Sequence, residues 1–194
     1  MPDFQHIDSF LAYLTAFHRL PNGLIEGIKR NAKVNEMKKG EVFTRKGAYD
    51  KKIGFLSEGI MRIYDVDTQG QQWNKVLLTY QTSLLGNTEL NQPAIHYIDA
   101  ITDCTIVELP ISFLEKALEE FQELREVRSK IVSRIYQMKS ERESDLLILS
   151  TKDRFLKLKD NVGDTIENIP QYHIASFLGI TPIQLSRIKS SLGA

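Results

Sequence analysis

The sequence predicts an α+β protein with a β-rich N-terminal part, a long central helix and a small all-helical C-terminal part. Three changes of periodicity along the 194 residues support this prediction. Apolar residues recur at helical spacing up to residue 36, short β-branched and aromatic runs separated by turns follow up to residue 110, and helical spacing then returns. We therefore divide the chain into three regions: 1–111, 112–149 and 150–194.

Composition limits the classes of protein that this chain can be. The formal net charge is zero, which weighs against a nucleic-acid partner, although a small basic segment can bind DNA within a neutral chain. Cys104 is the only cysteine, so an internal disulfide, an iron–sulfur cluster and a cysteine-rich zinc site are excluded, and we expect this thiol to be buried. The sequence shows no signal peptide and no membrane-length apolar run, which predicts a cytoplasmic protein.

The first region combines helices and strands. Residues 4–36 have helical spacing and are split into two pieces by the Pro21-Asn22-Gly23 turn. Residues 37–110 alternate short apolar runs with glycine-containing turns, and Asp67-Thr68-Gln69-Gly70 is typical of a hairpin turn. Short strands at such regular spacing predict a sandwich or a barrel.

The second region is predicted to be helical for about 40 residues after Pro110. Ser112 followed by Glu115 is a capping-box pattern at its start. Because so long a helix cannot bury a whole apolar stripe on one small barrel, we expect part of the stripe to face a second copy and to form a homodimer. The alternative is a helix that packs lengthwise on its own sheet. The stripe repeats at intervals of three, four and seven and comprises Leu124, Ile131, Ile135, Met138, Arg142, Asp145 and Leu149.

The third region ends in two short predicted helices joined by a tight turn, residues 169–191, which we call the reading head. Gly179 is placed to end the first helix in the left-handed conformation that glycine adopts readily. Thr181 is placed to cap the second helix, with Pro182 at its first position and Gln184 completing a capping box. The pattern predicts a helix-turn-helix whose second helix enters the major groove of DNA.

The outward side chains of the second helix suit contacts with double-stranded DNA. Arg187 is suited to guanine and Gln184 to adenine, while Lys189, Ser190 and the N–H groups near Thr181 are suited to phosphates. The alternative is an ordinary helical hairpin that mediates protein contacts. The predicted DNA-binding residues are Thr181, Ile183, Gln184, Ser186, Arg187, Lys189 and Ser190.

Several stretches resemble one known family. Residues 174–182, with Leu185-Ser186-Arg187-Ile188, closely resemble the reading head of the Crp/Fnr family of transcription regulators. Residues 39–47 and 55–62 resemble the opening strands of that family's cyclic-nucleotide-binding β-roll. The resemblance implies a β-roll sensor domain, that is, a double-stranded β-helix or jelly roll, followed by a dimerisation helix and a DNA-binding helix-turn-helix. RNA polymerase is a further candidate partner. Little sequence follows the second helix, so we expect the family's wing to be absent or minimal.

The same resemblance implies a degenerate nucleotide pocket. Nucleotide-binding members carry a glycine–glutamate pair, with an arginine some ten residues further on. Here Gly86 remains, Asn87 stands in place of the acid, and the arginine's place falls near Ala94. No arginine occurs between Arg62 and Arg125, so a cyclic phosphate would lack its bidentate cation. We therefore expect weak or no binding of cyclic AMP.

A candidate effector pocket could hold an unidentified small molecule, or side chains such as Tyr97 and Trp73 could fill it. No cofactor is predicted, because the sequence shows no convincing heme ligands. It also shows no nucleophile–base pair, metal cluster or glycine-rich phosphate loop, and so an enzyme is not expected. The candidate pocket residues are Gly86, Asn87, Thr88, His96, Tyr97, Lys139 and Ser140.

Overall fold

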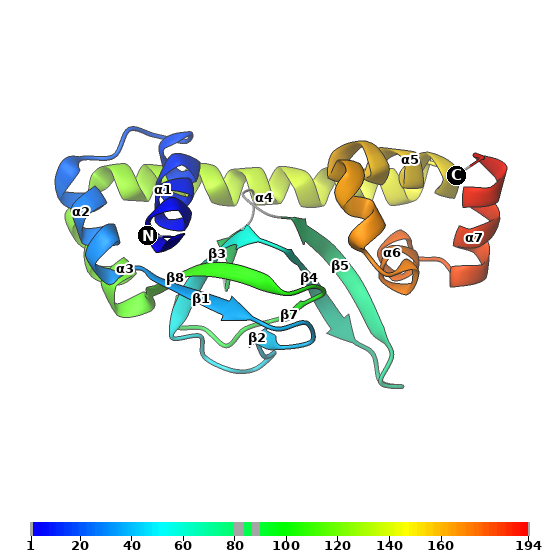
Figure 1. Cartoon of the computed structure of the whole chain (residues 1–194), viewed down its shortest axis with the longest axis horizontal. Coiled ribbons are helices and arrows are strands. Elements are labelled where there is room, and N and C mark those ends of the chain that lie inside the picture. Colours follow the sequence, from blue (N-terminus) through cyan, green and yellow to red (C-terminus); the bar gives the residue numbers. More distant parts are fainter. Residues whose placement is uncertain (1, 80–83, 87–89, 194) are drawn as a thin grey trace.

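The computed structural model describes residues 2–79, 84–86 and 90–193. Its architecture is the predicted α+β arrangement, with strands in the N-terminal part and helices after them. The long helix α4 (Gln122–Ile148) runs along one side of the molecule (Figure 1). The helices α1 to α3 gather at one end of α4, the helices α5 to α7 gather at the other, and the strands lie between the two groups.

Two N-terminal helices form where helical spacing predicted them, α1 (Pro2–Thr15) and α2 (Asn22–Asn31). The prediction of helix up to residue 36 is wrong at its end, because β1 (Lys33–Met37) is a strand. This strand pairs antiparallel with β8 (Cys104–Pro110), from Lys33 opposite Glu108 to Met37 opposite Cys104. Such pairing partners lie far along the chain, and local spacing does not reveal them.

The strands form two antiparallel sheets of four, in the orders β1-β8-β3-β6 and β2-β7-β4-β5. This is the predicted β-roll. The Asp67 carboxylate shapes the predicted hairpin turn by accepting hydrogen bonds from the N–H groups of Gln69 and Gln71. The remaining strands are β2 (Val42–Thr44), β3 (Lys52–Glu58), β4 (Ile60–Val66), β5 (Gln72–Thr79), β6 (Leu84–Leu85) and β7 (Tyr97–Ala100).

Buried side chains from both sheets form one apolar cluster. Cys104 belongs to it, as its predicted burial required. The suggestion that Trp73 fills the roll is wrong, because its side chain is 41% exposed. Tyr97 is partly buried and stacks on Tyr64 with ring centroids 5.2 Å apart. The buried members of the cluster are Leu56, Met61, Leu78, Leu85, Ile98, Ala100, Cys104 and Ile106.

The central helical region differs from its prediction in two ways. It consists of α3 (Ile111–Glu120) and α4, separated by the extended residue Phe121. The predicted capping box is absent, because α3 begins directly after Pro110 without a side-chain cap and Ser112 lies inside the helix. Pro110 occupies the N-cap position, and its ring offers no hydrogen-bond acceptor to the N–H groups of the first turn.

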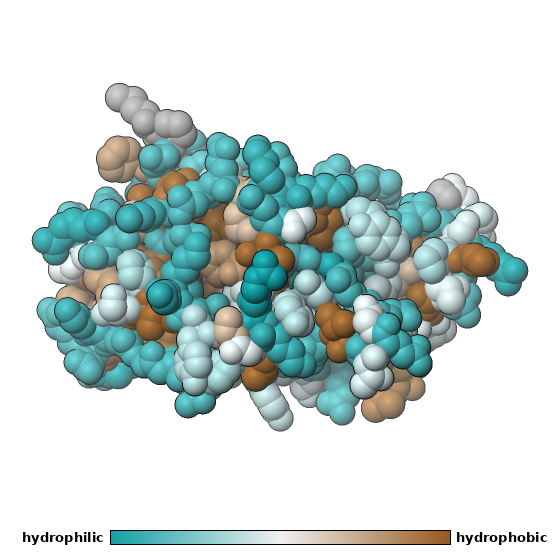
Figure 2. Space-filling view, turned by 90° about the horizontal axis from the view of Figure 1, so that it is seen from below, coloured by the Kyte–Doolittle hydropathy of each residue, from teal (hydrophilic) through white to brown (hydrophobic). Residues whose placement is uncertain are grey.

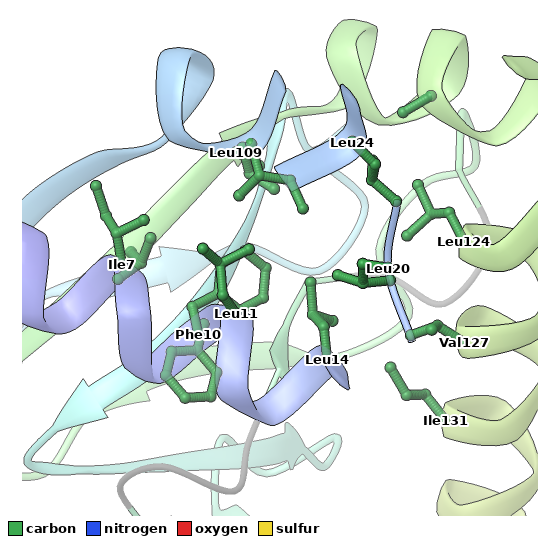
Figure 3. Close-up of a cluster of buried hydrophobic side chains, with 14 residues drawn as sticks. Ile7, Phe10, Leu11, Leu14, Leu20, Leu24, Leu109, Leu124, Val127 and Ile131 are labelled. Atoms are coloured by element: carbon green, nitrogen blue, oxygen red, sulfur yellow. The ribbon is translucent and has the colours of Figure 1, made fainter. Parts of the chain in front are cut away.

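The first half of α4 packs on its own chain. Leu124, Val127 and Ile131 are buried in a core shared with α1 and α2 (Figure 3). Ile135 is partly buried and packs against this core. These side chains therefore do not form an exposed dimer seam. The alternative, a helix packed lengthwise on its own sheet, agrees with the structure only in that the cover comes from the same chain. The cover is chiefly the N-terminal helices.

The C-terminal helices have a separate core. Ser150 caps α5 (Thr151–Val162) by accepting a hydrogen bond from the Asp153 N–H, and a 3-10 turn (Gly163–Asn168) leads into α6 (Gln171–Leu178). The last helix is α7 (Pro182–Ser191). Among the helices of the described ranges, none combines the length and the apolar character that crossing a membrane requires.

Candidate nucleic-acid interface

The turn between α6 and α7 has the predicted geometry. Gly179 adopts φ 72° and ψ 33°, the left-handed conformation, and its N–H points back to the carbonyls at the end of α6. The Thr181 hydroxyl accepts a hydrogen bond from the Gln184 N–H at 3.2 Å, while the Gln184 side chain accepts one from the Thr181 N–H at 2.9 Å. This is a complete capping box with Pro182 at the first helical position.

The helix α7 is anchored on one face and exposed on the other. Leu185 is fully buried, and Ile188 and Leu192 pack against the same core. Ile183 is 67% exposed, and Arg187 is also exposed. The structure thus brings the predicted DNA-binding residues together on one helix: all are exposed except Lys189, which is half-buried.

The surroundings of this face favour an anionic partner. Residues 168–194 contain no aspartate or glutamate, whereas Arg187 and Lys189 are basic. The start of α7 adds the positive end of the helix dipole. Two of the N–H groups near Thr181 are already paired inside the capping box, so fewer backbone donors remain for phosphate than the sequence suggested.

A buried polar cluster, which the sequence did not predict, joins the reading head to the β-roll. Arg62 and Asn74 of the roll meet His173 of α6, and the Arg62 Nη1 to His173 Nδ1 distance is 3.3 Å. Burial and, next, the nearby Arg62 charge lower the pKa of His173 to about 4. His173 is therefore neutral at pH 7, and its Nδ1 can accept a hydrogen bond.

A groove of about 400 Å³ lies next to this cluster. The start of β5, including Trp73, forms one wall, and Tyr172, Thr181 and Gln184 of the reading head contribute to the other. The N-terminal turn of α7 therefore faces the β4–β5 hairpin across open space.

The candidate effector-pocket residues lie in different surroundings. Gly86 is adjacent to Ile53 of β3, and His96 Nδ1 lies 3.0 Å from the Asp65 carboxylate. Tyr97 stacks on Tyr64, as described above. Lys139 and Ser140 are exposed on α4, and Asn87 and Thr88 fall outside the described residues.

The second half of α4 leaves apolar side chains in solvent. Arg142, predicted in the seam, instead donates a hydrogen bond to the Phe177 carbonyl, and Asp145 pairs with Lys157. Met138, also predicted in the seam, is 54% exposed. More of the exposed apolar side chains lie on a different face of α4, which carries Val132, Tyr136 and Leu146. The side of the molecule that faces away from α4 is mostly hydrophilic with scattered apolar patches (Figure 2). The exposed apolar residues of α4 are Val132, Tyr136, Met138, Leu146, Leu147 and Ile148.

Comparison with known proteins identifies the fold. No family model matches the sequence, and no curated protein matches it. Among solved structures, FixK2 from Bradyrhizobium japonicum superimposes with a TM-score of 0.76 at 16% identity, covering 84% of each chain. The c-di-GMP-responsive global regulator CLP from Xanthomonas campestris gives a TM-score of 0.71 at 12% identity, covering 89% of this chain and 92% of that one.

A transcriptional regulator of the CRP/FNR family from Thermus thermophilus gives a TM-score of 0.65 at 18% identity, covering 83% of this chain and 86% of that one. Each of these matches covers more than four fifths of this chain. At such low identity they establish the arrangement of the chain rather than its ligands. The chain therefore has the fold of the Crp/Fnr transcription regulators.

Proposed function

We propose that this chain is a transcription regulator that binds specific DNA sites as a homodimer. The observation that carries the proposal is the capped helix α7, which is anchored by Leu185 and presents Gln184, Ser186 and Arg187 to solvent next to a turn without acidic residues. The fold shared with known regulators supports it. A helix exposed in this way can enter a major groove.

Arg187 and Gln184 are the proposed base-reading residues. An arginine fork matches the two acceptors of guanine, and a glutamine amide matches the donor and acceptor of adenine. Lys189 and Ser190 are suited to phosphates, which position the helix without reading sequence. Thr181, Ile183 and Ser186 complete the proposed contact surface.

The first prediction tests this surface. Replacing Arg187 with alanine should weaken binding to the selected DNA site by about 1–3 kcal/mol, because a bidentate base contact is lost. The measurement is a fluorescence-anisotropy titration, at several salt concentrations, on a site obtained by selection from genomic fragments. Arg30→Ala is the matched control, since Arg30 is an exposed arginine on α2, at the opposite end of the molecule (Figure 1).

Equal affinity of Arg187→Ala and the wild-type protein would remove Arg187 from the reading role. Absence of any salt-dependent duplex binding by the wild type would favour the alternative function, in which the helical tail makes protein contacts only.

We propose that the dimer forms through the exposed face of α4 rather than the face that the sequence stripe marked. Val132, Tyr136 and Leu146 are exposed, and their spacing keeps them on one side of the helix. Two copies packed along this row would cover it and place two reading heads on one face of a duplex, with half-sites about 34 Å apart.

We propose further that the β-roll is a sensor that does not use cyclic AMP. The roll carries a packed apolar cluster, and Arg62 is bound to Asp99, Asn74, Gln72 and His173 instead of being available for a phosphate. An effector of another kind would act by changing the population of reading-head orientations.

A further inference from the structure

We propose that Arg62, Asn74 and Gln72 form an interdomain socket, which holds His173 and Ser176 of α6 and so sets the position of the recognition helix. His173 and Ser176 are then positioning residues: they determine where α7 lies without touching DNA themselves. This inference rests on the proposed function, because it concerns how two reading heads are spaced on one duplex.

The rigid part of the socket is the Arg62 guanidinium. The Asp99 carboxylate accepts from Nε at 2.6 Å and from Nη2 at 2.8 Å, a two-point contact between neighbouring strands. Nη2 also donates to Gln72 at 2.6 Å, and Nη1 donates to Asn74 at 3.2 Å. With the reading head in place only 8% of Arg62 is exposed, and its contacts with Asp99 and Gln72 involve no residue of the reading head.

The reading head completes this network through His173. Arg62 Nη1 lies 3.3 Å from His173 Nδ1, and Asn74 Nδ2 lies 3.2 Å from the same nitrogen. Asn74 Nδ2 also donates to the His173 carbonyl at 3.0 Å. Because His173 is itself 6% exposed, removing Nδ1 would take away a buried acceptor shared by Arg62 Nη1 and Asn74 Nδ2, although each of these groups keeps one other hydrogen bond.

Ser176, one turn further along α6, closes the edge of the sheet. β5 is the outer strand of its sheet, and its pairing with β4 shifts at Asn74, where Tyr64 opposes Asn74 and Ile63 opposes Val76. The Asn74 N–H donates to the Ser176 hydroxyl at 2.9 Å, and that hydroxyl donates to the Gln72 carbonyl at 3.3 Å. One hydroxyl thus satisfies two edge groups that a strand partner would otherwise take.

A second contact prevents the head from pivoting about the socket. Arg142 of α4 donates to the Phe177 carbonyl at 2.6 Å, and its guanidinium lies 3.8 Å from the centre of the Phe177 ring. The helix α6 is therefore held by the roll near its start and by the long helix near its end. Since α7 shares a core with α6, its orientation relative to the roll and to α4 follows.

The consequence is a fixed spacing between two recognition helices. Rigid heads bind two half-sites with the affinity of a preorganised bivalent ligand, but only where the separation of the half-sites matches. Loosely tethered heads would accept several separations and would bind each of them less tightly.

The experiment compares wild type with the double variant His173→Ala, Ser176→Ala on duplexes whose half-site separation is the selected one or differs by one or two base pairs. We expect the affinity ratio between the selected and the altered separations to fall by about tenfold in the variant. Affinity for a duplex with one half-site should remain unchanged, which distinguishes loss of positioning from damage to the reading head. His173→Asn, which keeps an acceptor near the place of Nδ1, should preserve the wild-type preference.

A second measurement needs no DNA. The backbone N–H of Asn74 should exchange with deuterium faster in Ser176→Ala than in wild type, because Ser176 is its acceptor. Unchanged exchange there, or an unchanged spacing preference in the double variant, overturns this inference and leaves the proposed function intact. A wild-type protein that binds no duplex overturns both.

Discussion

Arg62 and Arg187 illustrate what decides the role of an arginine in this chain. Arg187 is exposed on α7, where its guanidinium can reach a partner. Arg62 lies in a strand among apolar neighbours, and Asp99 and Asn74 take up its donors. The helix-turn-helix pattern marked Arg187 from local sequence. Asp99 is 37 residues away from Arg62 along the chain, so no local pattern could show that the two residues meet.

The low pKa of His173, about 4, makes stability depend on pH. In the unfolded chain an ordinary histidine takes up a proton near pH 6.5, whereas the folded chain resists protonation until about pH 4. The stabilisation from neutral His173 is therefore complete above pH 6.5 and declines as the pH falls towards 4. We expect the free energy of unfolding to drop by at most about 1.4 kcal/mol per pH unit from this group.

Urea denaturation at a series of pH values measures this dependence. His173→Asn has no proton to bind there, so the difference between wild type and this variant isolates the histidine from the other titrating groups. Parallel pH profiles of the two proteins would show that His173 does not have the low pKa.

The helix α4 shows why a periodic stripe is not sufficient to locate an interface. The sequence correctly marked an apolar face that includes Leu124 and Ile131, but these side chains pack on α1 and α2 of the same chain. Periodicity reports which face of a helix is apolar, whereas the covering partner depends on tertiary structure. The less apolar face with Val132 and Tyr136 remained exposed and did not stand out in the sequence.

Aspartate substitutions on the two faces of α4 should have different effects. Ile131→Asp places a charge in a core where Ile131 is 8% exposed, so it should destabilise folding of the chain itself by several kcal/mol. Tyr136→Asp, at a side chain that is 72% exposed, should leave the fold intact and weaken the proposed dimer.

Thermal unfolding and sedimentation of both proteins check this prediction. A Tyr136→Asp protein that remains as dimeric as wild type would show that the dimer uses another surface. Glu26→Asp, a conservative change on α2, is a control that should alter neither quantity.

At the scale of the whole molecule, the order of the three regions and the turn chemistry of the reading head followed from sequence. Gly179, Thr181 and Gln184 act through neighbours within a few residues, so their pattern is local and readable. The strand β1, the break at Phe121 and the socket around Arg62 depend on segments that are distant in sequence. Tertiary structure, rather than any local pattern, determines these features.

The proposal that the β-roll does not bind cyclic AMP gives a prediction for the whole chain. Adding cyclic AMP at millimolar concentration should leave the thermal unfolding temperature unchanged, because no arginine lies between Arg62 and Arg125 and Arg62 is engaged by the socket. A ligand that binds the folded state would raise that temperature by mass action. A clear rise with cyclic AMP would show that another cation serves the phosphate.

Leu146, Leu147 and Ile148 are exposed one after another at the end of α4, and Leu147 is 80% exposed. Successive residues of a helix point in different directions, so these side chains form no single patch. Leu146 continues the row of Val132 and Tyr136, which the proposed dimer would cover and a dissociated protomer would expose to water. Dilution should then increase the loss of protein on tubes and columns, because it favours dissociation of the proposed dimer. Ordinary aggregation has the opposite concentration dependence and increases at high concentration. The purified protein should therefore be stored at high concentration or with a mild detergent, because either condition keeps these apolar side chains covered.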